Sequence, residues 1–256
     1  MNKVNINQIQ TFKNSEKSFA TLTAYDFNSA AILNEAKIPL ILVGDSASMT
    51  IYGYDTTLPV SMDEMLLVVK AVTRACDYSL VVADMPFLSY QPSVEETIKN
   101  AGILMKEGGA GAVKLEGGQH VEKNIKALVD SGIPVLGHIG LTPQSFHQLS
   151  GYKIQGKTPQ AAQKIINDAM AVQRAGAFGV VLECIPESLA SQITDKLSIP
   201  TIGIGSGKTC DGQIQVFHDV MGLSKQKPPK HAMQYASIYQ EMKKAVLQYK
   251  DDVESL

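Results

Sequence analysis

The sequence predicts an α/β protein whose eight parallel strands close into a (β/α)8 barrel, the TIM-barrel fold. Short runs of β-branched and aliphatic residues alternate along the chain with longer amphipathic segments. The short runs are apolar at consecutive positions, as expected for a parallel sheet that helices cover on its outer face. With 256 residues, 45% of them hydrophobic, the chain has the size of one barrel around one core, so we expect a single domain over residues 1–256.

Eight runs are predicted to be strands because they combine apolar character with a length of four or five residues. They are residues 19–23, 40–43, 80–83, 112–115, 134–137, 179–182, 200–204 and 214–217. A doubly wound open sheet would give a similar alternation with helices, but eight units in a chain of this length favour closure into a barrel.

The amphipathic segments between these runs are predicted to be helices. They are residues 28–37, 62–74, 93–107, 120–131, 158–175 and 186–197. Glycines at positions 109, 132 and 176 follow predicted helices and supply the left-handed residue that ends them. The last unit is the least regular, because residues 219–229 look like a loop before a terminal helix predicted at 233–249. The connection 141–157 is long and rich in Gly, Gln and Ser, which is typical of a lid or an assembly surface.

Composition excludes several classes of protein. The formal charge is −2 and the 23 basic residues are scattered, so we expect no nucleic-acid partner. Residues 1–17 contain no apolar signal core, and the longest apolar stretch, residues 38–43, is too short to span a bilayer. Cys76, Cys184 and Cys210 are odd in number and lack Cys-x-x-Cys spacing, which indicates reduced thiols and a cytoplasmic, soluble protein.

Polar and ionisable residues gather where the predicted strands end, and functional groups of parallel barrels lie at that end. They are Asp45, Ser46, Asp84, Lys114, Glu116, His138 and Glu183. Each has a structural alternative. An aspartate can cap a helix or form a turn, a lysine and a glutamate can form an interior ion pair, and a histidine can be hydrogen-bonded in the core. Together they favour a functional site, because burying several carboxylates around one lysine is costly unless a cation compensates them.

This set of ligands suits magnesium. Carboxylate oxygens without a cluster of His or Cys indicate Mg²⁺ rather than zinc, and we predict Asp45, Asp84 and Glu116 as the ligands. Mg²⁺ seldom takes a full cage of protein ligands, so positions remain for water and for a chelating substrate such as a 2-oxo acid. Lys114 would then offer positive charge, together with the metal, where an enolate oxygen develops.

The glycine-rich segment 202–207 follows the seventh predicted strand, where many barrels bind phosphate. Residues 208–213 look like a further loop and not like the start of a helix, so the context of a dinucleotide-binding fingerprint is missing. Close approach of the backbone to a ligand or to a neighbouring strand is the favoured interpretation.

Motifs spread over nearly the whole chain resemble the ketopantoate hydroxymethyltransferase family. They are Thr23-Ala24-Tyr25-Asp26, Leu42-Val43-Gly44-Asp45-Ser46, Thr57-Leu58-Pro59-Val60, Asp84-Met85-Pro86-Phe87, Val113-Lys114-Leu115-Glu116-Gly117-Gly118, Gly137-His138-Ile139-Gly140-Leu141-Thr142-Pro143-Gln144, Gly151-Tyr152-Lys153-Ile154-Gln155-Gly156 and Asp211-Gly212-Gln213.

The resemblance implies a barrel of the phosphoenolpyruvate/pyruvate superfamily that depends on Mg²⁺. It implies transfer of the one-carbon unit of 5,10-methylenetetrahydrofolate to 3-methyl-2-oxobutanoate, which gives 2-dehydropantoate in pantothenate biosynthesis. The enolate of the 2-oxo acid would be stabilised by the metal. Members of the family form large homo-oligomers, commonly decamers.

The resemblance also implies a role for each candidate residue. Asp45 and Asp84 match metal ligands of the family, and Glu116 matches the third. Glu183 matches the proton acceptor. The positions that match substrate contacts are Asp45, Ser46, Asp84 and Lys114, and we add His138, which lies in a family motif near the site.

Two residues depart from the pattern of the family. Ser48 replaces an expected glycine and Lys208 an expected neutral residue, both in predicted loops near the opening of the barrel.

Two other functions are alternatives to hydroxymethyl transfer. The first is another Mg²⁺-dependent lyase or mutase of 2-oxo acids from the same superfamily. Enzymes of the isocitrate lyase type carry a Lys-Lys-Cys-Gly-His lid motif that this sequence lacks. The second rival is a barrel that binds a metabolite without catalysis.

Overall fold

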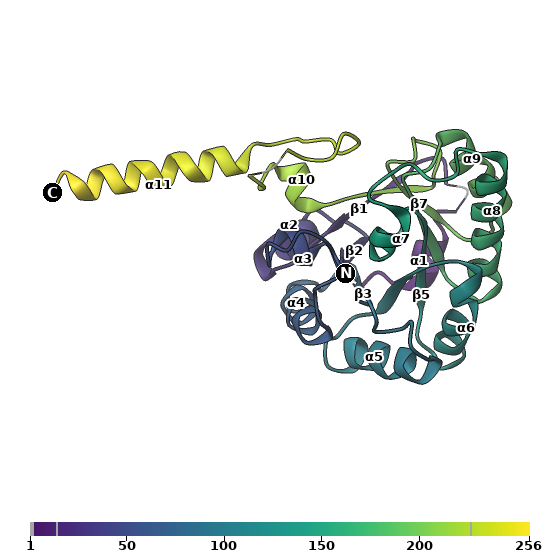
Figure 1. Cartoon of the computed structure of the whole chain (residues 1–256). Helices are drawn as coiled ribbons and strands as arrows, with labels where there is room; N and C mark the ends of the chain where they lie inside the picture. The colour runs from purple at the N-terminus through teal and green to yellow at the C-terminus, as the bar shows by residue number, and fades with distance from the viewer. Residues whose placement is uncertain (1–2, 14, 226) are drawn as a thin grey trace.

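A closed barrel of eight parallel strands forms the centre of the computed structural model, which describes residues 3–13, 15–225 and 227–256 (Figure 1). Each strand pairs with the next along the chain, and β1 pairs with β8 to close the ring. The strands are β1 Phe19–Thr23, β2 Leu40–Val43, β3 Leu80–Asp84, β4 Ala112–Glu116, β5 Val135–Gly140, β6 Gly179–Glu183, β7 Thr201–Ile204 and β8 Gly212–Gln215. The predicted fold is confirmed.

The six predicted helices are present, with ends that differ by a few residues at most, and they surround the strands (Figure 1). They are α2 Phe27–Glu35, α4 Met62–Ala75, α5 Val94–Lys106, α6 Glu122–Asp130, α8 Pro159–Arg174 and α9 Glu187–Lys196, with the 3-10 turn η1 Gln119–Val121 before α6. Helix α4 shows why such segments fold locally. Ser61 and Glu64 form a reciprocal capping box at its start, and an apolar stripe on one face is buried.

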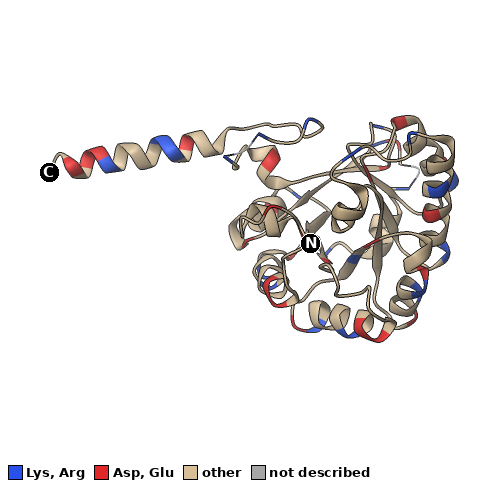
Figure 2. Ribbon diagram, viewed as in Figure 1, with Lys and Arg blue, Asp and Glu red and all other residues tan. Residues whose placement is uncertain are grey.

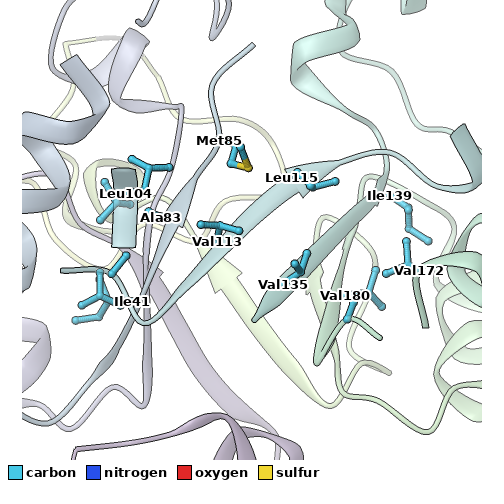
Figure 3. Packing of buried hydrophobic residues seen from close by; sticks show 14 of the residues in the cluster. Ile41, Ala83, Met85, Leu104, Val113, Leu115, Val135, Ile139, Val172 and Val180 are labelled. Carbon is cyan, nitrogen blue, oxygen red and sulfur yellow. The ribbon is translucent and has the colours of Figure 1, made fainter. Parts of the chain in front are cut away.

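Two apolar cores lie on opposite faces of the strands. Between strands and helices pack side chains such as Ile41, Val113 and Val172, which Figure 3 shows at intervals along that layer. Inside the barrel pack their neighbours in sequence, among them Leu40 and Ala112. Successive side chains of a strand point to opposite faces of the sheet. Every second residue of each strand therefore points into the barrel.

The glycine turns match the prediction. Gly109, Gly132 and Gly176 have φ of +78°, +80° and +94°, a conformation that ends a helix at little cost for glycine. After β7, Gly205 and Gly207 also have positive φ, and the chain proceeds to β8 without a helix, so the glycine-rich segment forms no dinucleotide-binding turn.

The end of the chain differs from the prediction. The eighth strand was expected at 214–217, but β8 ends at Gln215, and the short helix α10 Phe217–Met221 occupies the start of the expected loop 219–229. Strand β8 begins at Gly212, which pairs with Phe19 of β1 and leaves room for its ring; a β-carbon at Gly212 would approach that ring within 2.7 Å. The terminal helix α11 Ile238–Glu254 begins and ends later than predicted and extends away from the barrel (Figure 1).

Three other short helices were not predicted: α1 Ile6–Gln10, α3 Ala47–Thr50 and α7 Phe146–Leu149. The last lies in the connection 141–157, after the 3-10 turn η2 Pro143–Ser145, so that connection is partly ordered.

The state of the cysteines and the distribution of surface charge agree with what the composition predicts. Cys76, Cys184 and Cys210 are free and buried. Basic and acidic residues are interspersed on the outer helices and on α11 in the view of Figure 2. Within the described residues, no helix has both the length and the apolar character needed to cross a membrane.

Candidate functional site

The candidate residues on strands point into the barrel because they continue the inward alternation. On β4, Ala112 belongs to the interior core, so Lys114 and Glu116 follow it on the same face. In the same way Val82 precedes Asp84, Leu136 precedes His138, and Val181 precedes Glu183. Each polar residue therefore caps the apolar interior at the carboxyl end of its strand, where barrel enzymes place their sites.

Lys114 lies at the centre of this group and is buried. Its Nζ is 2.9 Å from Asp84 Oδ2 and 3.8 Å from Glu116 Oε1. Burial lowers the pKa of Lys114, but the charges of Asp84, Glu116 and Asp45 outweigh it and raise that pKa above its usual value. Lys114 is therefore a buried cation held by carboxylates.

His138 connects this group to Glu183. Its Nδ1 lies 3.3 Å from Glu116 Oε1, and its Nε2 lies 3.2 Å from Glu183 Oε2. Burial and the Lys114 charge lower the pKa of His138, but Glu116 and Glu183 raise it to about 9. At neutral pH we therefore assign a protonated ring. The 3.1 Å approach of Lys114 Nζ to Nδ1 is then a contact between two cations, which the surrounding carboxylates compensate. Nε2 has no well-aligned hydrogen bond, so its contact with Glu183 is an ion pair.

Two of the three carboxylates predicted as metal ligands, Asp45 and Asp84, have raised pKa values, whereas Glu116 is paired with Lys114 and His138. Burial, then the charges of Asp84 and Glu116, raise the pKa of Asp45 well above its usual value. Asp84 Oδ1 and Glu116 Oε1 are buried, and among the described residues neither oxygen has a hydrogen-bond partner. Glu116 Oε1 faces His138 and Lys114, but within the described residues Asp84 Oδ1 has no such partner, and together with the raised pKa of Asp45 this set of donors fits a hard divalent ion.

The same carboxylates are not arranged for immediate chelation. Within the described part of the chain, no three His, Cys, Asp or Glu side chains form a ready-made metal site. One reason is that Asp84 Oδ2 accepts the backbone N–H of Asp45 at 3.1 Å as well as the Lys114 contact. The assignment of the three ligands stays a prediction.

Ser46 directly follows Asp45 in the sequence and is the N-cap residue of α3. Its Oγ is 2.7 Å from Tyr25 Oη. Burial raises the pKa of Tyr25 to about 12, so the phenol is neutral and holds the serine through a hydrogen bond. The assignment of Ser46 as a substrate contact stays a prediction.

The two departures lie in different surroundings. Ser48 was expected in a loop near the opening, but it is a buried residue of α3, and its hydroxyl donates to the Thr56 carbonyl at 2.7 Å. Its place in a helix follows from the turn at 44–47, which the sequence pattern did not reveal. Lys208 lies in the loop after β7, as expected, and its backbone N–H donates to Glu187 Oε1 at 2.8 Å.

Two residues without a predicted role complete the site. Gln144 donates from Nε2 to Asp45 Oδ2 at 3.0 Å and from its backbone N–H to Glu116 Oε2 at 3.0 Å. The buried Tyr90 Oη contacts the backbone of Glu116 and the Gln144 side chain. The family motif that ends at Gln144 was the only sequence signal for it. Both residues lie in loops, where strand alternation gives no direction.

Comparison with known proteins gives one consistent match. The family model described as ketopantoate hydroxymethyltransferase matches residues 3–256. The 3-methyl-2-oxobutanoate hydroxymethyltransferase of Carboxydothermus hydrogenoformans is 51% identical over 253 residues, which cover 99% of this chain and 92% of that protein. The protein of the same name from Syntrophus aciditrophicus is 48% identical, and the match covers 99% of this chain and 93% of that protein.

Solved structures share the fold at low sequence identity. The phosphoenolpyruvate phosphomutase of Streptomyces platensis subsp. rosaceus superposes with a TM-score of 0.63 at 13% identity, covering 84% of this chain and 81% of that one. A 2,3-dimethylmalate lyase, a member of the PEP mutase/isocitrate lyase superfamily, gives 0.60 at 15% identity, covering 84% and 81%. These likenesses show the same barrel fold.

Proposed function

The chain belongs to the ketopantoate hydroxymethyltransferase family, and on that premise we propose that it transfers the one-carbon unit of 5,10-methylenetetrahydrofolate to 3-methyl-2-oxobutanoate, giving 2-dehydropantoate. The relatives named above carry the name of this hydroxymethyltransferase. The observation that carries the proposal is the group around Lys114: a buried cation and four nearby carboxylates converge at the carboxyl end of the barrel.

Lys114 is proposed to bind the anionic end of the 2-oxo acid and to stay positively charged throughout. Its raised pKa supports this role, because a protonated ammonium can stabilise negative charge that develops on the C2 oxygen of the substrate. Ser46, held by Tyr25, is proposed to donate a further hydrogen bond to the substrate.

Glu183 is proposed to remove the C3 proton. Its side chain is 16% exposed, against 1% for Asp84 and 2% for Glu116, so it is the most accessible of these three carboxylates. The proton moves to a Glu183 oxygen, the C3–H electron pair forms a C2–C3 double bond, and the carbonyl pair moves to the C2 oxygen. Water breaks the two C–N bonds of the one-carbon unit: its oxygen stays on that carbon and its two protons go to the folate nitrogens, so tetrahydrofolate leaves. The carbon nucleophile bonds to the same carbon, and the oxygen takes the proton back from Glu183 to give the hydroxyl group of the product. His138, 3.2 Å from Glu183, is proposed to orient that carboxylate.

Mg²⁺ is proposed as the cofactor, held by Asp45, Asp84 and Glu116, and when bound it would supply positive charge to the oxygens of the 2-oxo acid. The orphaned oxygen of Asp84 and the raised pKa of Asp45 support this assignment. The candidate base Glu183 is connected to the same group through His138, which favours an enzyme over a barrel that only binds a metabolite.

The principal alternative is another lyase or mutase of 2-oxo acids from the superfamily. Proteins of that kind share the fold at only 13–15% identity in the two structures compared above, whereas hydroxymethyltransferases share 48–51% identity over nearly the full chain. The difference favours the hydroxymethyl transfer.

The same proposal extends to the setting of the enzyme. We propose a cytoplasmic homo-oligomer with small-molecule substrates and no nucleic-acid partner. The buried free thiols and the interspersed surface charge support it.

A product assay tests the proposed function. Purified protein is incubated with 3-methyl-2-oxobutanoate, 5,10-methylenetetrahydrofolate and Mg²⁺, and 2-dehydropantoate is followed by mass spectrometry. We expect product only in the complete mixture, with loss after chelation of the metal. A folded protein that makes no 2-dehydropantoate would refute the assignment.

A further inference from the structure

Gln144 touches two of the three proposed metal ligands from one position in the chain. Its Nε2 donates to Asp45 Oδ2 and to the Met85 carbonyl, at 3.0 and 2.9 Å, and its backbone N–H donates to Glu116 Oε2 at 3.0 Å. The residue is 5% exposed. These bonds use one oxygen of each carboxylate and leave the other oxygen of each without a hydrogen bond to Gln144.

The orientation of the Gln144 amide is fixed from its other side. Its Oε1 accepts from Tyr90 Oη at 2.8 Å and from Gln91 Nε2 at 3.1 Å. A flipped amide would place Oε1 against the Asp45 carboxylate and the Met85 carbonyl and would lose both donors, so the amide nitrogen must face Asp45. Tyr90 Oη also accepts the backbone N–H of Glu116 at 3.2 Å, which ties the same network to β4.

Gln144 is also part of η2, at the start of the connection 141–157 between β5 and α8. Farther along this connection, Tyr152 packs on Phe146 with ring centroids 5.1 Å apart, and its Oη lies 3.8 Å from Met49 Sδ on α3. Burial, then the charges of Asp45, Glu183 and Glu116, raise the pKa of Tyr152, so its phenol lies within the field of the site. The connection thus reaches over the carboxyl end of the barrel, and Gln144 anchors its first turn.

We propose that Gln144 is a positioning residue that aims the Asp45 and Glu116 carboxylates at the cation and, through the same bonds, couples cation binding to the order of the connection 141–157. The inference rests on the proposed Mg²⁺ site. Coupling of this kind is reciprocal: a cation that fixes the two carboxylates strengthens the anchor of the connection, and a firmly anchored connection strengthens cation binding. Partners that orient metal ligands typically change metal affinity by about 10-fold to 100-fold when they are removed.

The test compares Gln144→Met with the wild type. Methionine retains the length of the side chain but removes its four amide hydrogen bonds, while the backbone bond to Glu116 stays. Gln155→Met is the matched control, because Gln155 lies in the same connection and its side chain bonds only the nearby Lys153 carbonyl. Mg²⁺ affinity is measured by titration calorimetry, and order of the connection by hydrogen–deuterium exchange of residues 141–157 with and without Mg²⁺. Thermal unfolding without metal verifies that each variant is folded.

We expect Gln144→Met to bind Mg²⁺ about 10-fold more weakly or worse, and to lose the protection that Mg²⁺ gives the connection in the wild type and in Gln155→Met. If Gln144 only satisfies buried groups, the variant unfolds at a lower temperature but binds Mg²⁺ normally, and the inference is wrong. Weaker binding with unchanged protection also overturns it.

Two results separate this inference from the proposed function. A wild-type protein that binds no Mg²⁺ refutes the metal site itself, and the inference falls with it. A wild-type protein that binds Mg²⁺, together with an unaffected Gln144→Met, refutes only the role of Gln144. If Gln144→Met shows no cooperative unfolding, Gln144→Asn takes its place under the same criteria, since an amide one methylene shorter cannot span from Tyr90 to Asp45.

Discussion

Four carboxylates and two cationic side chains share the carboxyl end of the barrel, so negative charge is in excess there. The cations are Lys114 and His138, and both have raised pKa values because carboxylates surround them. The excess of negative charge acts most strongly on Asp45. Its pKa rises well above its usual value because it is buried near Asp84 and Glu116. This residue is where a bound cation would stabilise the site most.

Replacing either Asp45 or Asp84 by asparagine tests whether these residues bind the cation. Asp45→Asn and Asp84→Asn retain an oxygen that can accept the bonds from Gln144 and Lys114, so both variants should fold. Each removes one negative charge from a hard cation, and we expect Mg²⁺ affinity to fall by about 10-fold or more in titration calorimetry. Asp168→Asn is the control, because Asp168 is buried elsewhere and pairs with Lys164. Unchanged affinity in either site variant would make that aspartate a turn or cap residue.

Among the elements, α8 approaches β5 closely because β5 has a glycine where the two meet. A β-carbon on Gly137 would lie 2.4 Å from Val172 Cγ1, so no larger residue fits without movement of the helix. His138 follows Gly137 directly, and the packing of α8 therefore helps to fix the strand that carries a site residue.

Gly137→Ala should destabilise the protein by about 1–3 kcal/mol through overpacking, seen as a lower midpoint in thermal or urea unfolding. Gly102→Ala is the matched control. It lies within α5 with no atom near its added β-carbon, so alanine should stabilise the helix by up to about 1 kcal/mol. Equal effects of the two substitutions would show that α8 and β5 adapt at this contact.

The elements also show what could be predicted from the sequence. Lys114 and Glu116 were predicted to lie at the end of the fourth strand, and the structure places them there, on the inward face of β4. Gln144 and Tyr90 were missed as contributors because they come from loops, whose course depends on contacts far apart in the chain. The short helices were missed for a related reason: four or five residues contain too little periodicity to be recognised. The early start of β8 at Gly212 was missed because Gly212 pairs with Phe19, a residue far away in the chain.

At the scale of the whole molecule, α11 is the feature that a single chain leaves unexplained. Every residue of this helix is described, and none is buried. Met242, Val246, Tyr249 and Val253 are exposed and spaced four, three and four residues apart, so they form one apolar stripe. Soluble monomers rarely expose such a surface, and the stripe supports the homo-oligomer proposed for this enzyme.

We expect the protein in solution to have a mass several times the 27.6 kDa of one chain, measured by light scattering after gel filtration. Val246→Glu should lower that mass, because it places a charge in the apolar stripe. Lys244→Glu introduces the same residue on the opposite face of α11 and should not change it. A monomeric wild type would contradict the proposed assembly, and equal effects of both variants would move the contact away from the stripe.

The central claim is that this barrel removes the C3 proton of 3-methyl-2-oxobutanoate and that Glu183 is the base, and exchange of that hydrogen in D2O tests it most directly. Enolisation needs no one-carbon donor, so wild-type protein with Mg²⁺ but without folate should exchange the C3 hydrogen, followed by NMR of the substrate. Glu183→Gln should retain the fold and lose exchange by about 10²-fold or more, the scale of a deleted general base. His138 is a poor substitute, because its two ring nitrogens already contact Glu116 and Glu183. Exchange that persists in Glu183→Gln, or a wild type that never exchanges the hydrogen, would contradict the account.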